Sequence, residues 1–174
     1  IEGEDLSQEF LDGSWLLIIF AGNDTTRNTM SGGIKLLHEN PEQKQLVLDD
    51  YERVTGLINE TVRYVSPVIH MRRTSLKETI IGDQKIGPYE KIALWYGAAN
   101  RDPDIFKSPD EFNILRENAD KHLAFGIGRH TCLGKPVALM QLKEFFSQFL
   151  IMFSNITLVS GVGKQQKKVK ALNI

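Results

Sequence analysis

Apolar and polar positions divide the first 65 residues into two helical stretches. From about residue 6 to residue 40, apolar residues dominate EFLDGSWLLIIFAG and continue through TTRNTMSGGIKLLHEN up to Pro41, which predicts one long helix. Residues 41–65 repeat apolar positions at helical spacing and stop at SP (Ser66, Pro67), which predicts a second helix. The segment AGNDTT, small and polar, interrupts the apolar character of the first helix.

The hydrophobic period changes after Pro67. Between residues 68 and 98, the pieces ETIIG, QKIGP and KIALWYGAA are separated by glycine and proline, which predicts a small antiparallel sheet of short strands. Residues 100–132 are rich in turn residues and predict a long loop, and such loops are usually functional. A last helix is predicted from near Cys132 through LGKPVALMQLKEFFSQFLIMF, with burial on more than one face. The fold class is therefore mainly α with small antiparallel β-sheets.

Composition narrows the function classes. The 174 residues are 41% hydrophobic, and 21 Lys+Arg against 22 Asp+Glu give a net charge of -1, which favours neither nucleic acid nor a membrane surface as a partner. The most apolar stretch, Trp15 to Ala21, is far shorter than the roughly 18 residues of a membrane span. No signal pattern opens the chain, so we expect a cytoplasmic protein. We expect the Lys-rich segment at 164–170 to be a solvated surface.

One cysteine stands in a distinctive frame. A single cysteine excludes an internal disulfide framework, and the four histidines do not have zinc-site spacing. In FGIGRHTCLG, two glycines permit tight turns ahead of Cys132, and a predicted helix N-terminus would favour the thiolate, which is the species that ligates iron. Taken alone, a lone cysteine is more often a small buried hydrophobe.

Two further motifs lie on the predicted helices. Glu60 and Arg63 are three residues apart, so their side chains share one helix face, although a bare pair of this kind is usually an exposed ion pair of little energetic weight. In AGNDTT, hydroxyl groups in mid-helix can bond back to the preceding turn and bend the helix without any chemical role. Each of these motifs is non-specific when it occurs alone, and it indicates a function only together with the other motifs of the chain.

The whole frame Phe-Gly-x-Gly-x-His-x-Cys-x-Gly resembles the heme-ligand loop of the cytochrome P450 superfamily. The three motifs also follow the order of that family, and the resemblance covers essentially all 174 residues. It implies the C-terminal part of the cytochrome P450 fold, with the long central helix, the ExxR helix, and the heme-ligand loop and helix. Because the chain begins at Ile1 rather than methionine, we expect residues 1–174 to be a partial domain that lacks its N-terminal half.

The resemblance assigns a role to each motif. Cys132 would be the axial ligand of the heme iron, Thr25 would hydrogen-bond bound dioxygen, and Asp24 would relay protons. Arg116 would join the pair on the ExxR helix in a structural cluster that braces the loop before the cysteine. The heme contacts would be Arg73, Phe125, Gly126, His130 and Gly134, with Arg72 as the alternative to Arg73, and the substrate pocket would include Ala21, Gly22, Val68 and Ile69.

The implied activity is a monooxygenase that uses heme b and O2 to hydroxylate an unactivated C–H bond. NDTTRNTMSGG, HENPEQ, SPVIHMRRT and LMQLKEFF look like soluble bacterial hydroxylases of the terminal carbon of alkanes and fatty acids, and sterol or terpenoid hydroxylases are the runner-up. Leu139 and Gln141 stand where bacterial members commonly have arginine and glutamate. A peroxide-driven hydroxylase, against which Asp24 and Thr25 argue, and a heme-binding sensor module without turnover are the two rival functions.

Electrons would have to come from outside the chain. The sequence carries no flavin or nicotinamide fingerprint and no second cysteine for an iron–sulfur cluster. NAD(P)H would therefore supply electrons through a ferredoxin reductase and a ferredoxin. We expect the ferredoxin to dock on the cysteine side, where Arg129, Lys135 and Lys143 offer positive charge.

Overall fold

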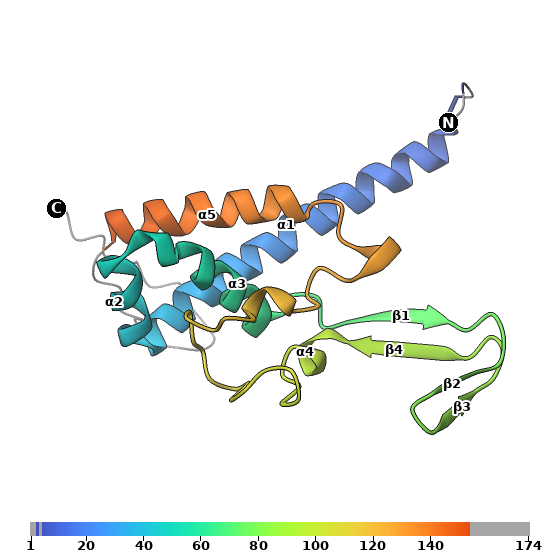
Figure 1. Cartoon of the computed structure of the whole chain (residues 1–174). Helices are drawn as coiled ribbons and strands as arrows, with labels where there is room; N and C mark the ends of the chain where they lie inside the picture. Colours follow the sequence, from blue (N-terminus) through green and yellow to red (C-terminus); the bar gives the residue numbers. More distant parts are fainter. Residues whose placement is uncertain (1–2, 4, 154–174) are drawn as a thin grey trace, which may run out of the picture.

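A computed structural model describes residue 3 and residues 5–153, so the Lys-rich segment at 164–170 lies outside the described residues. The α-helices are α1 (Gln8–Glu39), α2 (Pro41–Asp49), α3 (Val54–Val65), α4 (Tyr96–Ala99) and α5 (Lys135–Met152). The strands are β1 (His70–Thr74), β2 (Thr79–Ile81), β3 (Gln84–Ile86) and β4 (Lys91–Trp95), and short 3-10 turns are η1 (Tyr51–Arg53), η2 (Ala119–Lys121) and η3 (Gly128–His130). Figure 1 shows the helices gathered on one side and the strands extending from them as a narrow arm.

The first predicted helix is confirmed as one unbroken element. Helix α1 begins after Ser7, whose Oγ accepts a hydrogen bond from the Phe10 N–H at 3.2 Å. It ends at Glu39, and its C-cap Asn40 directly precedes Pro41. The AGNDTT segment does not interrupt it. A hydroxyl bonded to the preceding turn leaves the backbone hydrogen bonds in place, so the helix continues through these residues.

The second predicted helix is wrong as a single element. Residues 41–65 form α2, the turn η1 and α3 in succession. Asp50 adopts an extended backbone, and its Oδ1 accepts a hydrogen bond from the Glu52 N–H at 3.1 Å. An aspartate that caps a new turn in this way competes with continuation of the helix before it.

The predicted sheet is two separate two-stranded antiparallel ribbons. Strand β1 pairs with β4 in the register His70↔Trp95 to Thr74↔Lys91, and β2 pairs with β3. Ser75 holds the junction between them, because its N–H donates to the Glu90 carbonyl and its carbonyl accepts from the Tyr89 N–H. The predicted strand KIALWYGAA ends at Trp95, and its last residues turn into α4 instead.

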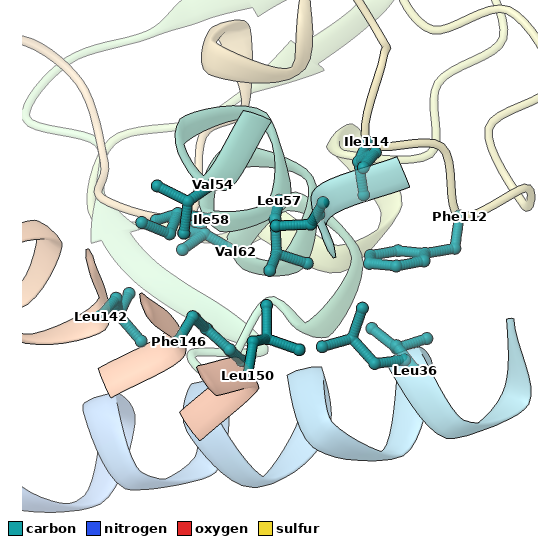
Figure 2. Packing of buried hydrophobic residues seen from close by; sticks show 13 residues of the cluster. Leu36, Val54, Leu57, Ile58, Val62, Phe112, Ile114, Leu142, Phe146 and Leu150 are labelled. Atoms are coloured by element: carbon teal, nitrogen blue, oxygen red, sulfur yellow. The ribbon is translucent and has the colours of Figure 1, made fainter. Parts of the chain in front are cut away.

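The core lies where α1, α3 and α5 meet the loop around residues 112–114 (Figure 2). Its buried members are Leu36, Leu37, Val47, Val54, Leu57, Ile58, Val62, Phe112, Ile114, Ala124, Leu142, Phe146 and Leu150. Close approach of two helices requires Gly33, since a Cβ there would lie 2.4 Å from Phe146 Cζ. This packing fixes α5 against α1 and so places the segment that precedes α5.

Helix α5 differs from its prediction in both start and burial. It begins at Lys135, after an N-cap at Gly134, so Cys132 lies outside the helix. Leu142, Phe146 and Leu150, four residues apart, are buried, while Val137, Met140 and Ile151 are exposed. In this structure the helix therefore buries one stripe.

The apolar side chains in the N-terminal half of α1 are exposed to solvent. Six consecutive apolar side chains from Trp15 to Phe20 are 59–71% exposed. Figure 1 shows this part of α1 projecting beyond the other elements. Among the residues that the structure describes, no helix is long and apolar enough to cross a membrane.

Candidate functional site

A buried ion cluster joins α3 to the long loop. Glu60 and Arg63 are 0% exposed, and the Arg116 side chain is 7% exposed. Arg63 Nε and Nη2 each donate to one Glu60 oxygen at 2.8 Å, which makes the pair bidentate. Arg116 Nε lies 3.2 Å from both oxygens of the same carboxylate. The three residues that the resemblance groups together are therefore in direct contact.

The two guanidinium groups also hold the loop by its backbone. Their remaining N–H groups donate to the carbonyl oxygens of Asn100, Lys107, Ser108, Pro109 and Glu111. Glu60 Oε1 accepts a further hydrogen bond from the Asn113 N–H at 3.0 Å. Two positive charges thus share one carboxylate, and carbonyl dipoles surround the excess charge, as burial of ions requires.

The cysteine loop is closed by backbone hydrogen bonds. The Cys132 N–H donates to the Phe125 carbonyl at 2.8 Å, and the Gly126 N–H donates to the Leu123 carbonyl at 2.8 Å. Gly126 has φ +71, and a Cβ there would lie 2.7 Å from the carbonyl oxygen of His130. A glycine is required at this position on both counts.

The sulfur lies on the open side of this loop. Cys132 is a free, exposed cysteine two residues before the N-cap of α5. Within the described part of the chain, the N–H groups of Leu133 and Gly134, which directly follow it, make no hydrogen bond. Leu133, which directly follows the cysteine, is 96% exposed, and Ile127, earlier in the same loop, is 73% exposed. The loop thus carries an exposed cysteine, two N–H groups without a hydrogen-bond partner in the described residues, and two exposed apolar side chains.

Asp24 and Thr25 lie side by side on α1, and each is engaged locally. Asp24 accepts hydrogen bonds from Arg27 Nη2 and Asn28 Nδ2, both at 3.0 Å. Thr25 Oγ1 donates to the Ala21 carbonyl at 2.8 Å. Among the residues described, no hydrogen bond or ion pair links this pair to the cysteine loop.

A groove of about 490 Å³ runs between α1 and α5 beside this pair. Gly22, Asn23, Thr26, Arg27 and Met30 line it from α1, and Gln141, Glu144 and Phe145 line it from α5. The predicted pocket residue Gly22 is on this groove and Ala21 is exposed next to it. Val68 is half-buried and Ile69 exposed at the start of the strand arm, and neither lines the groove.

The predicted heme contacts other than the loop glycines lie on β1 and on the cysteine loop. Arg72 and Arg73 are adjacent on β1 and so point to opposite faces of the ribbon. Arg73 is half-buried and Arg72 is exposed. His130 is exposed in the turn η3 of the cysteine loop. Lys135 Nζ lies 5.6 Å from the centroid of the half-buried Phe125 ring.

Sequence reasoning missed two buried polar residues beside the cysteine loop. Asn100 is fully buried, and its Oδ1 accepts the Leu123 N–H at 2.6 Å. His122 is buried, and its Nδ1 accepts the Ala124 N–H at 3.2 Å. Burial, aided by the nearby charge of Lys135, lowers the pKa of His122 to about 4. No spacing rule marks either residue, because their partners are more than 20 positions away or on the backbone.

A sequence model of the family described as Cytochrome P450 matches residues 1–170. The chain belongs to the cytochrome P450 family. It spans about a third of the length of the curated relatives that it matches. The resemblance of the motifs is thereby confirmed at the level of the family.

Relatives and solved structures agree with this assignment. Linalool 8-monooxygenase of Pseudomonas putida is 38% identical over 146 residues, which are 84% of this chain and 36% of the relative. A methyl-branched lipid omega-hydroxylase of Mycobacterium bovis is 35% identical over 150 residues, 85% of this chain and 35% of the relative. The structure of cytochrome P450-153 from Novosphingobium aromaticivorans matches with a TM-score of 0.77 at 42% identity, covering 79% of this chain and 35% of that one. The predicted P450 fold is confirmed.

Membership of the cytochrome P450 family implies a heme group, and the cysteine loop fits one. An exposed thiol followed by two unused N–H groups offers a ligand atom with hydrogen-bond donors beside it. The same loop also carries exposed apolar side chains at Leu133 and Ile127. A thiol ligand and exposed apolar side chains on one loop are the chemistry that a heme iron and its porphyrin would require.

Proposed function

We propose that the protein carrying this chain is a heme-thiolate monooxygenase that hydroxylates an unactivated C–H bond of a small hydrophobic substrate. The observation that carries the proposal is the cysteine loop, in which backbone hydrogen bonds and Gly126 hold Cys132 as a free, exposed cysteine. The bound group, which we assign as heme b, would supply the activation of dioxygen. Monooxygenase and hydroxylase names among the relatives support the reaction class.

Cys132 would hold the iron through its sulfur. The N–H groups of Leu133 and Gly134 follow it directly and are available to donate to a thiolate. Such donors stabilise negative charge on sulfur and set the strength of its bond to a metal. Phe125, Gly126, His130 and Gly134 of the same loop, together with Arg73 on β1, would make the remaining contacts, and the two basic side chains would face the propionates.

Asp24 and Thr25 on α1 would supply and relay the protons that the reaction consumes. The hydroxyl of Thr25 is committed to the Ala21 carbonyl and must release it in order to donate elsewhere. Asp24, held between Arg27 and Asn28, is oriented beside that hydroxyl by two hydrogen bonds. Splitting the bond of dioxygen requires two protons at a site kept dry, so an acid and an alcohol in succession suit the reaction.

The substrate class we favour is an alkane or fatty acid attacked at its terminal carbon. The motifs NDTTRNTMSGG and SPVIHMRRT carry this choice, and the name of the methyl-branched lipid omega-hydroxylase supports it. The groove between α1 and α5, with Gly22 on its wall, is next to the exposed Ala21 that would border the substrate. Sterol or terpenoid hydroxylation is the second candidate, which the name of linalool 8-monooxygenase favours.

Electrons would arrive from NAD(P)H through a ferredoxin reductase and a ferredoxin in the cytoplasm. Arg129 and Lys143 are exposed on the loop and on α5, and Lys135 lies between them in sequence at the start of α5. Neutralising these three residues should slow electron transfer and flatten its dependence on salt. An unchanged rate and salt dependence would remove this surface as the docking site.

The decisive experiment replaces Cys132 by serine in the whole protein that carries this chain. Heme binding is measured first, followed by the absorption of the reduced carbon monoxide complex and by product formation with NADH and a ferredoxin system. We expect the variant to lose both the long-wavelength Soret band of a thiolate complex and the product. Survival of the band and the product would overturn the proposal.

Two controls separate this outcome from the rival functions. Thr131→Ser keeps the hydroxyl that donates to the Gly128 carbonyl at 2.9 Å, so this matched change in the same loop should retain the band. A sensor module would give the thiolate spectrum in the unaltered protein and no product. A peroxide-driven enzyme would give product with peroxide alone and would be insensitive to Thr25→Ala.

A further inference from the structure

Asn100 uses every polar group it has, although it is 0% exposed. Its N–H donates to the Tyr96 carbonyl at 2.9 Å, and its carbonyl accepts from Arg63 Nη1 at 2.7 Å. Its side-chain Nδ2 donates to Ser66 Oγ at 2.8 Å, and its Oδ1 accepts the Leu123 N–H at 2.6 Å. Asn100 therefore touches the ion cluster with its backbone and the start of the cysteine loop with its side chain.

From Leu123 the hydrogen bonds continue to the cysteine. The Leu123 carbonyl accepts the Gly126 N–H, and one residue before that glycine the Phe125 carbonyl accepts the Cys132 N–H, both at 2.8 Å. The peptide N–H of Ala124 is also held by a side chain, at His122 Nδ1. Two successive N–H groups are thus fixed by buried side chains directly ahead of the loop.

We propose that Asn100 is a positioning residue that transmits the rigidity of the Glu60–Arg63–Arg116 cluster to the cysteine loop. By holding the Leu123 N–H, it sets the backbone that ends in the Phe125 carbonyl, and that carbonyl anchors Cys132. The role as a determinant of sulfur placement rests on the proposed function of Cys132 as a metal ligand. The hydrogen-bond link itself does not depend on that function.

An amide is the side chain that this position demands. Ser66 Oγ donates its hydrogen to the Arg63 carbonyl at 2.8 Å and so needs a donor from Asn100, whereas Leu123 needs an acceptor. Asparagine offers one of each at a fixed spacing, aspartate offers acceptors only, and leucine has a similar branched outline but offers neither. Aspartate would therefore keep the hydrogen bond to Leu123 and lose the one to Ser66, whereas leucine would lose both, so the two variants distinguish the effects of the two hydrogen bonds.

The test compares Asn100→Leu, Asn100→Asp and Ser66→Ala in the whole heme-loaded protein. Backbone amide exchange is followed at Leu123 and Cys132, with Leu142 in the core as the reference for global opening. We expect Asn100→Leu to accelerate exchange at Leu123 and Cys132 by roughly tenfold beyond any change at Leu142, as loss of one buried hydrogen bond implies. Asn100→Asp and Ser66→Ala keep the acceptor for Leu123 and should stay within about threefold of the unaltered protein at that amide.

The absorption spectrum of the reduced carbon monoxide complex is measured for the same variants. The share of reduced carbon monoxide complex that shows the thiolate Soret band should fall in Asn100→Leu and recover in Asn100→Asp. Asn118→Leu is the matched control, because Asn118 donates to the Ile105 carbonyl elsewhere in the same long loop and should leave both readings unchanged.

Three results would overturn the proposal. One is equal acceleration at Leu142, Leu123 and Cys132 in Asn100→Leu, which would make Asn100 a general stabiliser. Another is fast exchange at Leu123 in Asn100→Asp, which decides the matter even if the leucine variant does not fold. The third is an unchanged band despite fast exchange. Failure of the proposed function would appear separately, as survival of the band in Cys132→Ser.

Discussion

The ion cluster, which joins α3 to the long loop, and the cysteine loop, which precedes α5, are built in opposite ways. Glu60, Arg63 and Arg116 are buried, and their charges are met by side chains and carbonyls of the described residues. The cysteine loop is shaped by backbone bonds and turns its side chains outward, with Leu133 almost fully exposed. The cluster is complete within these 174 residues, whereas the loop presents unused groups to a further component.

The difference follows from the energetics of the two kinds of group. A buried charge without partners is very costly, so a cluster of three must satisfy every donor and acceptor in the fold itself. An exposed thiol and two exposed N–H groups are satisfied by water, so the loop can keep them free. The substitutions below test how much stability depends on the cluster and the contacts around it, and whether Thr25, outside both regions, affects chemistry without affecting stability.

The largest loss of stability is expected for Glu60→Gln. The change removes the carboxylate that both guanidinium groups share, and two buried positive charges are left without it. We expect the free energy of unfolding to fall by about 3 to 5 kcal/mol. Chemical denaturation measures it, and Glu52→Gln, an exposed glutamate in η1, is the control. A loss below about 1 kcal/mol would place the cluster among ordinary surface ion pairs.

The next effect concerns pH and His122, which lies between the two regions. Burial and Lys135 lower the pKa of His122 from 6.5 to about 4, so the unfolded chain takes up a proton first as pH falls. The contribution of His122 to the free energy of unfolding should therefore decline from about pH 6.5 and level off near pH 4, by up to about 3 kcal/mol. Nearby Asp120 opposes the shift and Arg63 adds to it.

His122→Asn isolates this contribution. Asparagine keeps an acceptor for the Ala124 N–H and removes the titrating ring, so the difference in unfolding free energy between the two proteins should shrink as pH falls through this range. Denaturation curves at a series of pH values measure the difference, and His70→Asn on the exposed face of β1 is the matched change. A difference that stays constant with pH would contradict the prediction.

A smaller loss of stability is expected for Gly56→Ala, because the added methyl group would clash with the loop that packs against α3. A Cβ at residue 56 would lie 2.3 Å from the carbonyl oxygen of Ile114, and that backbone must shift. We expect a cost of about 1 to 3 kcal/mol, measured by thermal or chemical unfolding. Gly97→Ala is the control, because no atom lies within 4 Å of its added Cβ. Equal behaviour of the two variants would mean that the contact with Ile114 relaxes freely.

The smallest change in stability, with a large change in chemistry, is expected for Thr25→Val. Valine keeps the shape of the half-buried side chain and loses only the local bond to the Ala21 carbonyl, so stability should change by no more than about 0.5 kcal/mol. The share of electrons from NAD(P)H that is recovered in product should fall, and the amount of hydrogen peroxide released should rise. Thr29→Val, which removes a similar bond to the Thr25 carbonyl at 2.8 Å, should leave that share unchanged. Equal coupling in all three proteins would exclude a proton-transfer role for Thr25.

Some features of the fold can be predicted from local sequence because their causes are local. The bounds of α1 follow from Ser7 and Pro41, and both signals act within a few residues. The break between α2 and α3 escapes prediction because Asp50 can be either a helix residue or a cap, and its backbone conformation decides between them. The start of α5 lies three residues after its predicted position, since the turn around Gly134 leaves no distinct mark in the sequence.

The sequence by itself determined the family, because the motifs that indicate it depend on residue types at fixed short spacings. The tertiary structure decided which polar groups are buried together. It brought Arg116 to Glu60 across 56 positions and Asn100 to Leu123 across 23. Such contacts are set by how α3 packs against the loop, and the hydrogen bonds of a buried group depend on that packing rather than on its neighbours in the chain.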